Sequence, residues 1–273
     1  MLLQPSDLVG CRYRLPQKQR HPDIPPTDTT YARRRRLAIA RRQATVLLPT
    51  HPQRGDKKLF HRVDLGTFDD AEDRWFATLE ALAAKATIIT DAMLHTTCGG
   101  HAFAVPIDAL VRRPDGNYMP VLITNHRIIR PDPNRTIQVI GTRRLGLGTP
   151  NIGHYRLKHH SADSFTLALA NHALADVGHA AQRGILIGQD PEIAVILDTE
   201  LLEQGLQLAL KQPIPAHAHR VKECGTCRFW PLCEAELVER DDLSLLFAGD
   251  KSAQYQRAGI ITVADLAQEP AGN

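Results

Sequence analysis

The sequence predicts an α/β fold, and three features of the 273-residue chain support that class. An arginine-rich helix comes first, two strand-like segments joined by a tight turn follow, and an Ala- and Leu-rich helix then precedes a short apolar strand. Helices and strands in such an order are typical of a sheet covered by helices. The chain is 43% hydrophobic and 23% charged, which excludes a mostly disordered or fibrous protein.

Two helices are predicted before residue 90. In residues 31–48, four apolar side chains recur at helical spacing, namely Leu37, Ala40, Ala44 and Leu48. Residues 69–86 begin with acidic side chains, which the positive N-terminal end of a helix dipole stabilises. We assign the apolar residues of this second helix to the core, because they recur at core spacing: Trp75, Phe76, Leu79, Leu82 and Ala83.

A β-hairpin is predicted over residues 101–130. Its two strand-like segments flank the sequence PDGN at 114–117, which is a strong turn signal. The next predicted helix spans 163–181, with Ser161 or Asp163 as its N-cap. The apolar run 192–198 predicts a further buried strand, whereas the segments around 131–133 and 146–153 are predicted loops.

Positive charge is concentrated in the N-terminal part of the chain. Residues 1–62 carry 14 Lys and Arg against 4 Asp and Glu, whereas residues 63–273 carry 19 against 26. No acidic residue lies between Asp28 and Asp56, so the arginines of the predicted helix lack a nearby counter-charge. A solvated helix surface is the alternative, but we favour contact with the phosphates of a polyanion. The arginines concerned are Arg33, Arg34, Arg36, Arg41 and Arg42.

The strongest chemical signal is the segment CGTCRFWPLC, which contains Cys224, Cys227 and Cys233. Three thiols so close in sequence can converge on one metal centre. Cys11 and Cys98 are candidates for a fourth thiolate, and His219 is a candidate for the fourth ligand of a zinc ion. Zinc and an iron–sulfur cubane both fit this spacing. Three reduced core cysteines, or a redox-active dithiol, are the alternatives without a metal.

Cys11, in the sequence SDLVGCRYR, and the distant cysteine triplet resemble the cysteine arrangement of RecB-like iron–sulfur nucleases, which include CRISPR-associated and AddB-type proteins. The resemblance continues through the basic helix, the hairpin and the helix at 163–181. It implies a restriction-endonuclease-like fold, with a central mixed sheet flanked by helices. It also implies a [4Fe–4S] cluster that joins the N- and C-terminal segments, with Cys98 left as an ordinary thiol. The implied ligands are Cys11, Cys224, Cys227 and Cys233. Such a cluster would close a long loop, so its implied role is structural.

The same resemblance implies a catalytic site, from which this sequence departs. Nucleases of the family hydrolyse phosphodiesters with carboxylates that bind Mg²⁺ or Mn²⁺ and with a lysine near the attacking water. Asp108 matches the first carboxylate, the alternative being an Asp held by backbone amides. The acid-x-Lys motif of the next strand is replaced by Leu-Ile-Thr at 122–124. Thr166 and Ala170 stand at the positions of the family's Gln-x-x-x-Tyr helix motif, and the basic helix has no metal-ligating His.

A rebuilt catalytic site would need other groups, because a single carboxylate holds Mg²⁺ poorly. His126 is expected to be catalytic together with Asp108, and the further substitutes are Asn125, His95, His101 and Asp132. Two arginines of the predicted hairpin, Arg112 and Arg113, are expected to bind the DNA backbone with the arginine-rich helix.

The predicted organisation is a nuclease-fold domain over 1–240 and a helical tail over 241–273. Short helices are predicted beside Gly249 and Gly259, with Thr262 at the start of the last one. They resemble a helical hairpin module whose turns offer backbone N–H groups to phosphates. A plain pair of capping helices is the alternative.

Three functions remain as alternatives. The first is a cytoplasmic DNA-repair protein that acts on single-stranded DNA or DNA ends, as a metal-dependent exonuclease if it is active, with a helicase or another repair protein as partner. The second is a catalytically inactive DNA-binding or scaffold subunit, which the Leu-Ile-Thr replacement favours. The third is a zinc-stabilised interaction module. A membrane protein is not expected, because no apolar run reaches the roughly 18 residues of a membrane span.

Overall fold

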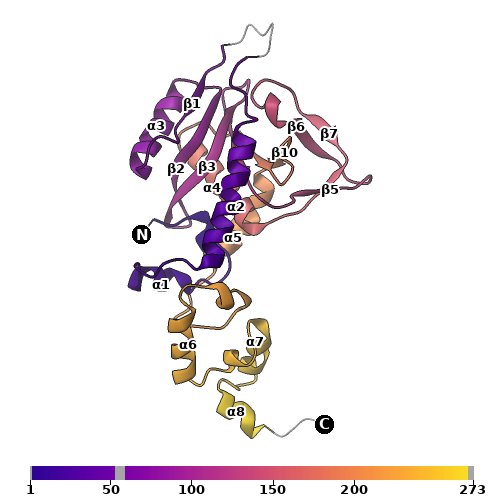
Figure 1. Ribbon diagram of the computed structural model, residues 1–273. Coiled ribbons are helices and arrows are strands. Elements are labelled where there is room, and N and C mark those ends of the chain that lie inside the picture. Colours follow the sequence, from indigo (N-terminus) through magenta and orange to yellow (C-terminus); the bar gives the residue numbers. More distant parts are fainter. Residues whose placement is uncertain (1, 53–58, 270–273) are drawn as a thin grey trace. The chain divides into compact units, whose positions relative to one another are not determined.

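The computed structural model describes residues 2–52 and 59–269 (Figure 1). The chain divides into two compact units. The first consists of Met1–Val9 and Arg35–Lys211, and the second of Gly10–Arg34 and Gln212–Asn273. The boundary expected at residue 240 stays a prediction.

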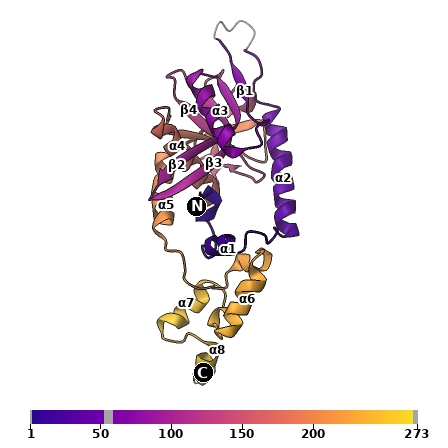
Figure 2. The ribbon, with the colours of Figure 1, turned by 90° about the vertical axis from the view of Figure 1, so that its left-hand side faces the viewer.

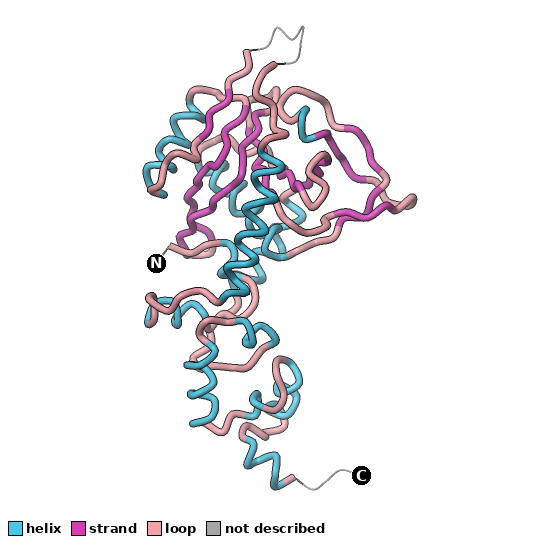
Figure 3. The backbone as a smooth tube through the Cα atoms, in the orientation of Figure 1, coloured by secondary structure: helices cyan, strands magenta, loops and turns pink. Residues whose placement is uncertain are grey.

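The first unit is built around a large mixed sheet, in which eight strands have the order β1-β2-β3-β4-β9-β10-β6-β7. A separate pair consists of β5 and β8. All named strands of the described chain belong to this unit, as the magenta segments in Figure 3 show. The strands are β1 (Arg62–Asp64), β2 (Ile88–Cys98), β3 (His101–Arg112), β4 (Tyr118–Ile123), β5 (Ile129–Pro131), β6 (Ile137–Gly141), β7 (Asn151–Gly153), β8 (Tyr155–Leu157), β9 (Arg183–Ile187) and β10 (Ile193–Asp198).

The centre of the sheet combines a meander with a crossover. Strands β2, β3 and β4 pair antiparallel, whereas β4 and β9 are parallel. Parallel neighbours need a long connection, and here α4 (Ser161–Asp176) lies in it. Strand β10 then returns antiparallel to β9. The predicted α/β class is therefore confirmed, as a mixed central sheet flanked by helices.

Helices cover both faces of this sheet. Helix α2 (Asp28–Thr45) lies on one side, with its C-terminal half in the first unit, and α4 and α5 (Glu200–Lys211) lie on the other (Figure 2). Helix α3 (Ala71–Ala83) packs beside β2. Its N-cap Asp70 accepts hydrogen bonds from the N–H groups of Glu72 and Asp73.

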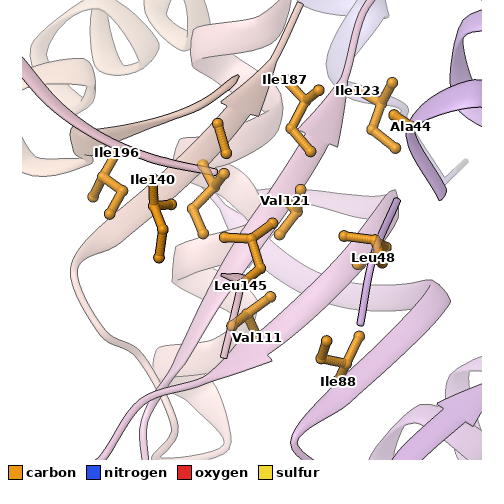
Figure 4. Close-up of a cluster of buried hydrophobic side chains, with 13 residues drawn as sticks. Ala44, Leu48, Ile88, Val111, Val121, Ile123, Ile140, Leu145, Ile187 and Ile196 are labelled. Carbon is orange, nitrogen blue, oxygen red and sulfur yellow. The ribbon is translucent and has the colours of Figure 1, made fainter. Parts of the chain in front are cut away.

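The core beneath α2 explains why the strands are rich in Ile and Val. Alternate residues of neighbouring strands, such as Val121, Ile123 and Ile187, face Ala44 of α2 and Leu48 just beyond it (Figure 4). Each of these side chains is almost wholly buried. Burying one side chain of this size contributes about 1.5–3 kcal/mol, so the pattern fixes which face of each strand points inward.

Several predicted elements need correction. The sequence analysis missed the strands β1, β2, β6, β8 and β9 and the helices α1, α5 and α6, and the hairpin's second strand ends at Ile123 rather than near residue 130. The predicted loops around 131–133 and 146–153 are also wrong in part, because Pro131 ends β5 and Asn151–Gly153 form β7. Phe76 is half exposed, and of the predicted core residues of α3 only Leu82 is buried, since the helix covers the sheet with one narrow stripe. The N-cap of α4 is His160, not Ser161 or Asp163.

The second unit is mainly helical and brings together segments from both ends of the chain. The Tyr13 hydroxyl donates to Oε2 of Glu236 at 2.8 Å, and the N–H of Ala218 donates to Oε1 of the same carboxylate at 2.9 Å. Tyr13, Ala218 and Leu237 form its buried core. The helices are α1 (Arg14–Arg20), α6 (Trp230–Glu239), α7 (Asp250–Arg257) and α8 (Val263–Gln268).

Candidate functional site

The arginines of α2 are presented on an exposed helix surface. Arg33, Arg34, Arg36 and Arg42 are all exposed, and within 2–52 and 59–269 their side chains form no hydrogen bond or ion pair. Their charges therefore stay available to an external partner. Arg41 differs, because it is half-buried and already paired.

Arg41 pairs with Asp108, the carboxylate predicted to be catalytic. Its Nε lies 2.6 Å from Oδ1 of Asp108, while the N–H of Ile123 donates to Oδ2 at 2.6 Å. Asp108 lies on β3 and is 7% exposed. The structure thus satisfies this carboxylate with an arginine and a backbone amide, and the two residues predicted for separate roles are in contact.

Burial dominates the electrostatics of Asp108. It raises the pKa of this carboxyl to about 6, although Arg41 and the Ile123 amide act in the opposite direction. The nearby Asp91 raises the pKa further. A carboxyl in this state can exchange a proton near neutral pH, which is a common property of functional sites.

The positions of the missing acid-x-Lys motif belong to the core. Leu122, Ile123 and Thr124 are buried at the end of β4, and Ile123 packs into the cluster under α2. On α4, the Thr166 hydroxyl donates to the carbonyl of Ala162, and Ala170 is fully buried. None of these side chains can supply a charged ligand.

A second group of titratable residues lies where β4 leaves the sheet. His126, predicted as catalytic, follows β4, and its Nε2 lies 2.9 Å from Oδ2 of Asp163 in the first turn of α4. The His160 ring is 3.8 Å from the His126 ring, centroid to centroid. The sequence analysis did not single out His160, and it named Asp163 only as a possible N-cap. The clustered polar residues KHHSAD just before a helix were the signal that could have revealed them.

Burial also shifts the pKa values in this group. It raises the pKa of Asp163 to about 6, against the influence of His160. It lowers the pKa of His126 and of His160, and Lys158 lowers both further. These influences favour the neutral form of both imidazoles.

The other substitute ligands do not join this group. His95 stacks on Trp75, with 4.7 Å between ring centroids. Oδ1 of Asp132 accepts a hydrogen bond from the Asn134 N–H. Asn125 is exposed, and His101 begins β3. Among the hairpin arginines, Arg113 is 3.4 Å from Asp115 and Arg112 is partly buried, so neither is as free as the α2 arginines.

A cavity of about 390 Å³ adjoins the loop that carries His126. It is lined by Arg127, Tyr155, Gln189 and Asp190 among mostly apolar neighbours. The N–H of Gln189 donates to the His126 carbonyl at 2.9 Å, which ties the cavity wall to the histidine. An aromatic ring with charged and amide groups suits a small polar ligand.

Four of the five cysteines belong to the second unit. Cys11, Cys224, Cys227 and Cys233 are all free thiols there, whereas Cys98 is buried in the first unit. Burial raises the pKa of Cys233 to about 12, and Cys227, Cys11 and Cys224 raise it as well. The thiols therefore lie close enough to influence one another. Two donors point at them, the Val221 N–H at 3.3 Å from Cys224 Sγ and the Gln17 amide at 3.8 Å from Cys233 Sγ.

This donor set suits a centre bound by four thiolates, either an iron–sulfur cluster or a zinc ion. Four thiols from two distant segments, with N–H groups directed at sulfur, are the chemistry such a cluster needs. The zinc candidate His219 is engaged elsewhere, since its Nε2 lies 3.2 Å from the Ser252 hydroxyl and 3.4 Å from the Gly249 carbonyl. As the side chains stand, no group of three or more His, Cys, Asp or Glu in the described residues is arranged to hold a metal ion.

The tail glycines use their amides internally. The N–H of Gly249 donates to the Arg220 carbonyl, and the N–H of Gly259 donates to the Gln256 carbonyl. Thr262 caps α8, as expected, by accepting from the Asp265 N–H. These contacts favour the capping pair of helices over a module that presents the two glycine amides to phosphates.

Neither family models nor curated proteins give a relative of this chain. No family model matches the chain, and a search of curated proteins finds no significant match. In the part of the chain that the structure describes, no helix is both long and apolar enough to cross a membrane.

Proposed function

We propose that this chain is a DNA-binding protein with a RecB-like, restriction-endonuclease-like fold, acting on single-stranded DNA or DNA ends in DNA repair in the cytoplasm. One observation carries the proposal: exposed arginines without partners lie along a helix that packs on the sheet and reaches Asp108. Arginines so placed bind phosphates without reading sequence.

The order of elements supports the fold in this proposal. The family's first carboxylate lies on a hairpin strand, its acid-x-Lys motif on the next strand, and its Gln-x-x-x-Tyr motif on the following helix. In this chain Asp108 lies on β3, residues 122–124 at the end of β4, and Thr166 and Ala170 on α4. On this proposal, the chain has elements at the family's motif positions but carries different residues there.

Of the two forms of this proposal, we favour a protein that binds DNA but does not hydrolyse it at the Asp108 site. Leu122, Ile123 and Thr124 are buried and uncharged, and Asp108 is held by Arg41. Hard cations need several oxygen ligands, so Asp108 alone would bind Mg²⁺ or Mn²⁺ weakly. The [4Fe–4S] cluster belongs to the proposal as a structural group held by Cys11, Cys224, Cys227 and Cys233.

The binding test compares two variants of equal charge loss. One replaces Arg33, Arg34, Arg36 and Arg42 with Gln, and the other replaces four exposed arginines of the first unit, Arg135, Arg143, Arg144 and Arg156. Fluorescence anisotropy of a labelled single strand is followed over a salt series. We expect the α2 variant to lose affinity. The negative slope of log K against log salt should become less steep by about 3. Equal effects of both variants, or salt-independent binding by the wild type, would refute the proposal.

A cleavage assay decides between the binding protein and the nuclease. Labelled single-stranded DNA is incubated with Mn²⁺ and either wild-type protein or the Asp108→Ala variant. We expect binding without cleavage. Cleavage by the wild type that is lost in the variant would make Asp108 catalytic and the protein an exonuclease or endonuclease according to the products. Zinc in a colourless protein that does not bind DNA would support the interaction module instead.

A further inference from the structure

Three polar atoms near the N-terminus of α4 are buried without hydrogen-bond partners. They are Nε2 of His126, Nε2 of His160 and Oδ2 of Asp163, and none has a hydrogen bond within the described residues. Buried polar atoms normally form hydrogen bonds, so an unsatisfied set indicates a missing ligand or strain. Here the three atoms belong to two neighbouring segments, the loop after β4 and the start of α4.

The distance between two of these atoms suggests what the ligand is. Nε2 of His126 and Oδ2 of Asp163 are 2.9 Å apart, although neither forms a hydrogen bond. Two donors that bind one ion at about 2.0–2.1 Å, at octahedral or tetrahedral angles, lie about 2.8–3.4 Å apart. The observed separation falls in that interval.

The types of the three residues indicate which class of metal ion they would bind. Two imidazoles with one carboxylate are typical ligands of divalent first-row transition metals, whereas Mg²⁺ and Ca²⁺ prefer oxygen alone. The side chains of Asp163 and His126 are partly shielded from bulk water, with 14% and 31% of them exposed.

We propose that His126, His160 and Asp163 bind one divalent transition-metal ion. The His160 ring lies tilted against the His126 ring, with 3.8 Å between their centroids, and on this proposal a turn of the His160 side chain brings its Nε2 to the ion that the other two residues hold. The site is separate from the Asp108 position of the nuclease family and does not depend on DNA binding.

The test is a Co²⁺ titration of the full-length protein, followed by equilibrium dialysis and visible absorption. Co²⁺ held by imidazole and carboxylate gives weak visible bands, whereas Co²⁺ on thiolates adds intense near-ultraviolet bands, so the cysteine group can be recognised separately. We expect one Co²⁺ per chain without thiolate bands. His126→Gln, His160→Gln and Asp163→Asn should each weaken it at least about tenfold.

Matched controls locate the ion. His159→Gln alters the exposed neighbour of His160, and Cys227→Ser alters the thiol group; both should leave this Co²⁺ signal unchanged. Co²⁺ should also raise the Tm of the wild type but not of the three ligand variants, which is a readout that does not depend on activity. Absence of such a signal, its survival in the ligand variants, or its loss in Asp108→Asn alone would overturn the proposal.

Discussion

The guanidinium of Arg41 and the carboxylate of Asp108 are 2.6 Å apart, and this contact joins the arginine-rich helix to the central strand β3. The carboxylate is almost wholly buried, whereas the arginine side chain is 42% exposed. An external phosphate could therefore compete for Arg41 at the very residue that neutralises Asp108. The arginine-rich helix and the carboxylate are thus linked through one ion pair.

Replacing Asp108 with Asn should change how stability depends on pH. The folded carboxyl has a pKa of about 6, above its ordinary value of 3.8, so between these values the folded protein binds more protons than the unfolded chain. The contribution of Asp108 to the free energy of unfolding is therefore fully present below pH 3.8, and it is lost as the pH rises to about 6. We expect Asp108→Asn to stabilise the protein at pH 8 by up to about 3 kcal/mol, and much less at pH 4.

Urea unfolding at both pH values, in buffer with a chelator, measures this difference. A variant that is less stable than the wild type at pH 8 would show that Arg41 and the Ile123 amide outweigh the cost of burial.

Removing Arg41 should destabilise the protein at pH 8, in contrast to Asp108→Asn. Arg41→Gln leaves the buried Asp108 without its counter-charge, and we expect a loss of about 1–2 kcal/mol at pH 8, a value reduced by the solvent exposure of the arginine. In the Asp108→Asn background the same change should cost little. Arg42→Gln, on the exposed neighbour, is the control and should stay within about 0.5 kcal/mol. Additive effects in the double variant would show that the pair contributes nothing.

Cysteine substitutions should separate the proposed cluster from the ordinary thiol. Cys11→Ser removes a thiol from the second unit, and we expect loss of bound iron, of sulfide and of the brown colour after anaerobic purification. The constraint that the cluster places on the unfolded chain contributes on the order of 4–5 kcal/mol in the chain-entropy view, so the Tm should fall as well. Cys98→Ser is the control and should retain full iron. Equal iron in both variants would exclude Cys11 as a ligand.

Gly188 should matter for the position of His126. A Cβ at this residue would lie 2.6 Å from Cγ1 of Ile128 and 3.0 Å from the His126 carbonyl oxygen, so the loop must shift. We expect Gly188→Ala to cost about 1–3 kcal/mol and to weaken Co²⁺ binding. Gly205→Ala in α5 is the control: its Cβ would meet Phe165 at an ordinary 3.6 Å, and the change should stabilise the helix by about 0.5–1 kcal/mol. Thermal melting and Co²⁺ titration of both variants provide the comparison.

Local patterns in the sequence were enough for the α/β class, for the helix α2, for the hairpin β3–β4 and for the strand β10. The spacing of apolar residues, the turn residues and the charge are local properties. A helix, a hairpin or a strand can therefore be recognised from one segment of the sequence. Strand β2 lacked such a signal, because it is buried on both faces and reads as a mixture of Ile, Thr and Ala. The start of α4 was also misplaced, since its N-cap His160 has no side-chain hydrogen bond to the helix.

The sequence by itself determined which residues can carry chemistry: the α2 arginines, Asp108, His126 and the four cysteines of the second unit. Only the tertiary structure decided which of them meet. Arg41 and Asp108 are 67 positions apart in the numbering and form an ion pair, and His126 meets Asp163 across the β4–α4 connection. Long-range contacts depend on how strands and helices pack, and burial then sets the pKa values of the carboxyls. The spacing of residues along the chain predicts neither these contacts nor the burial of the carboxyls.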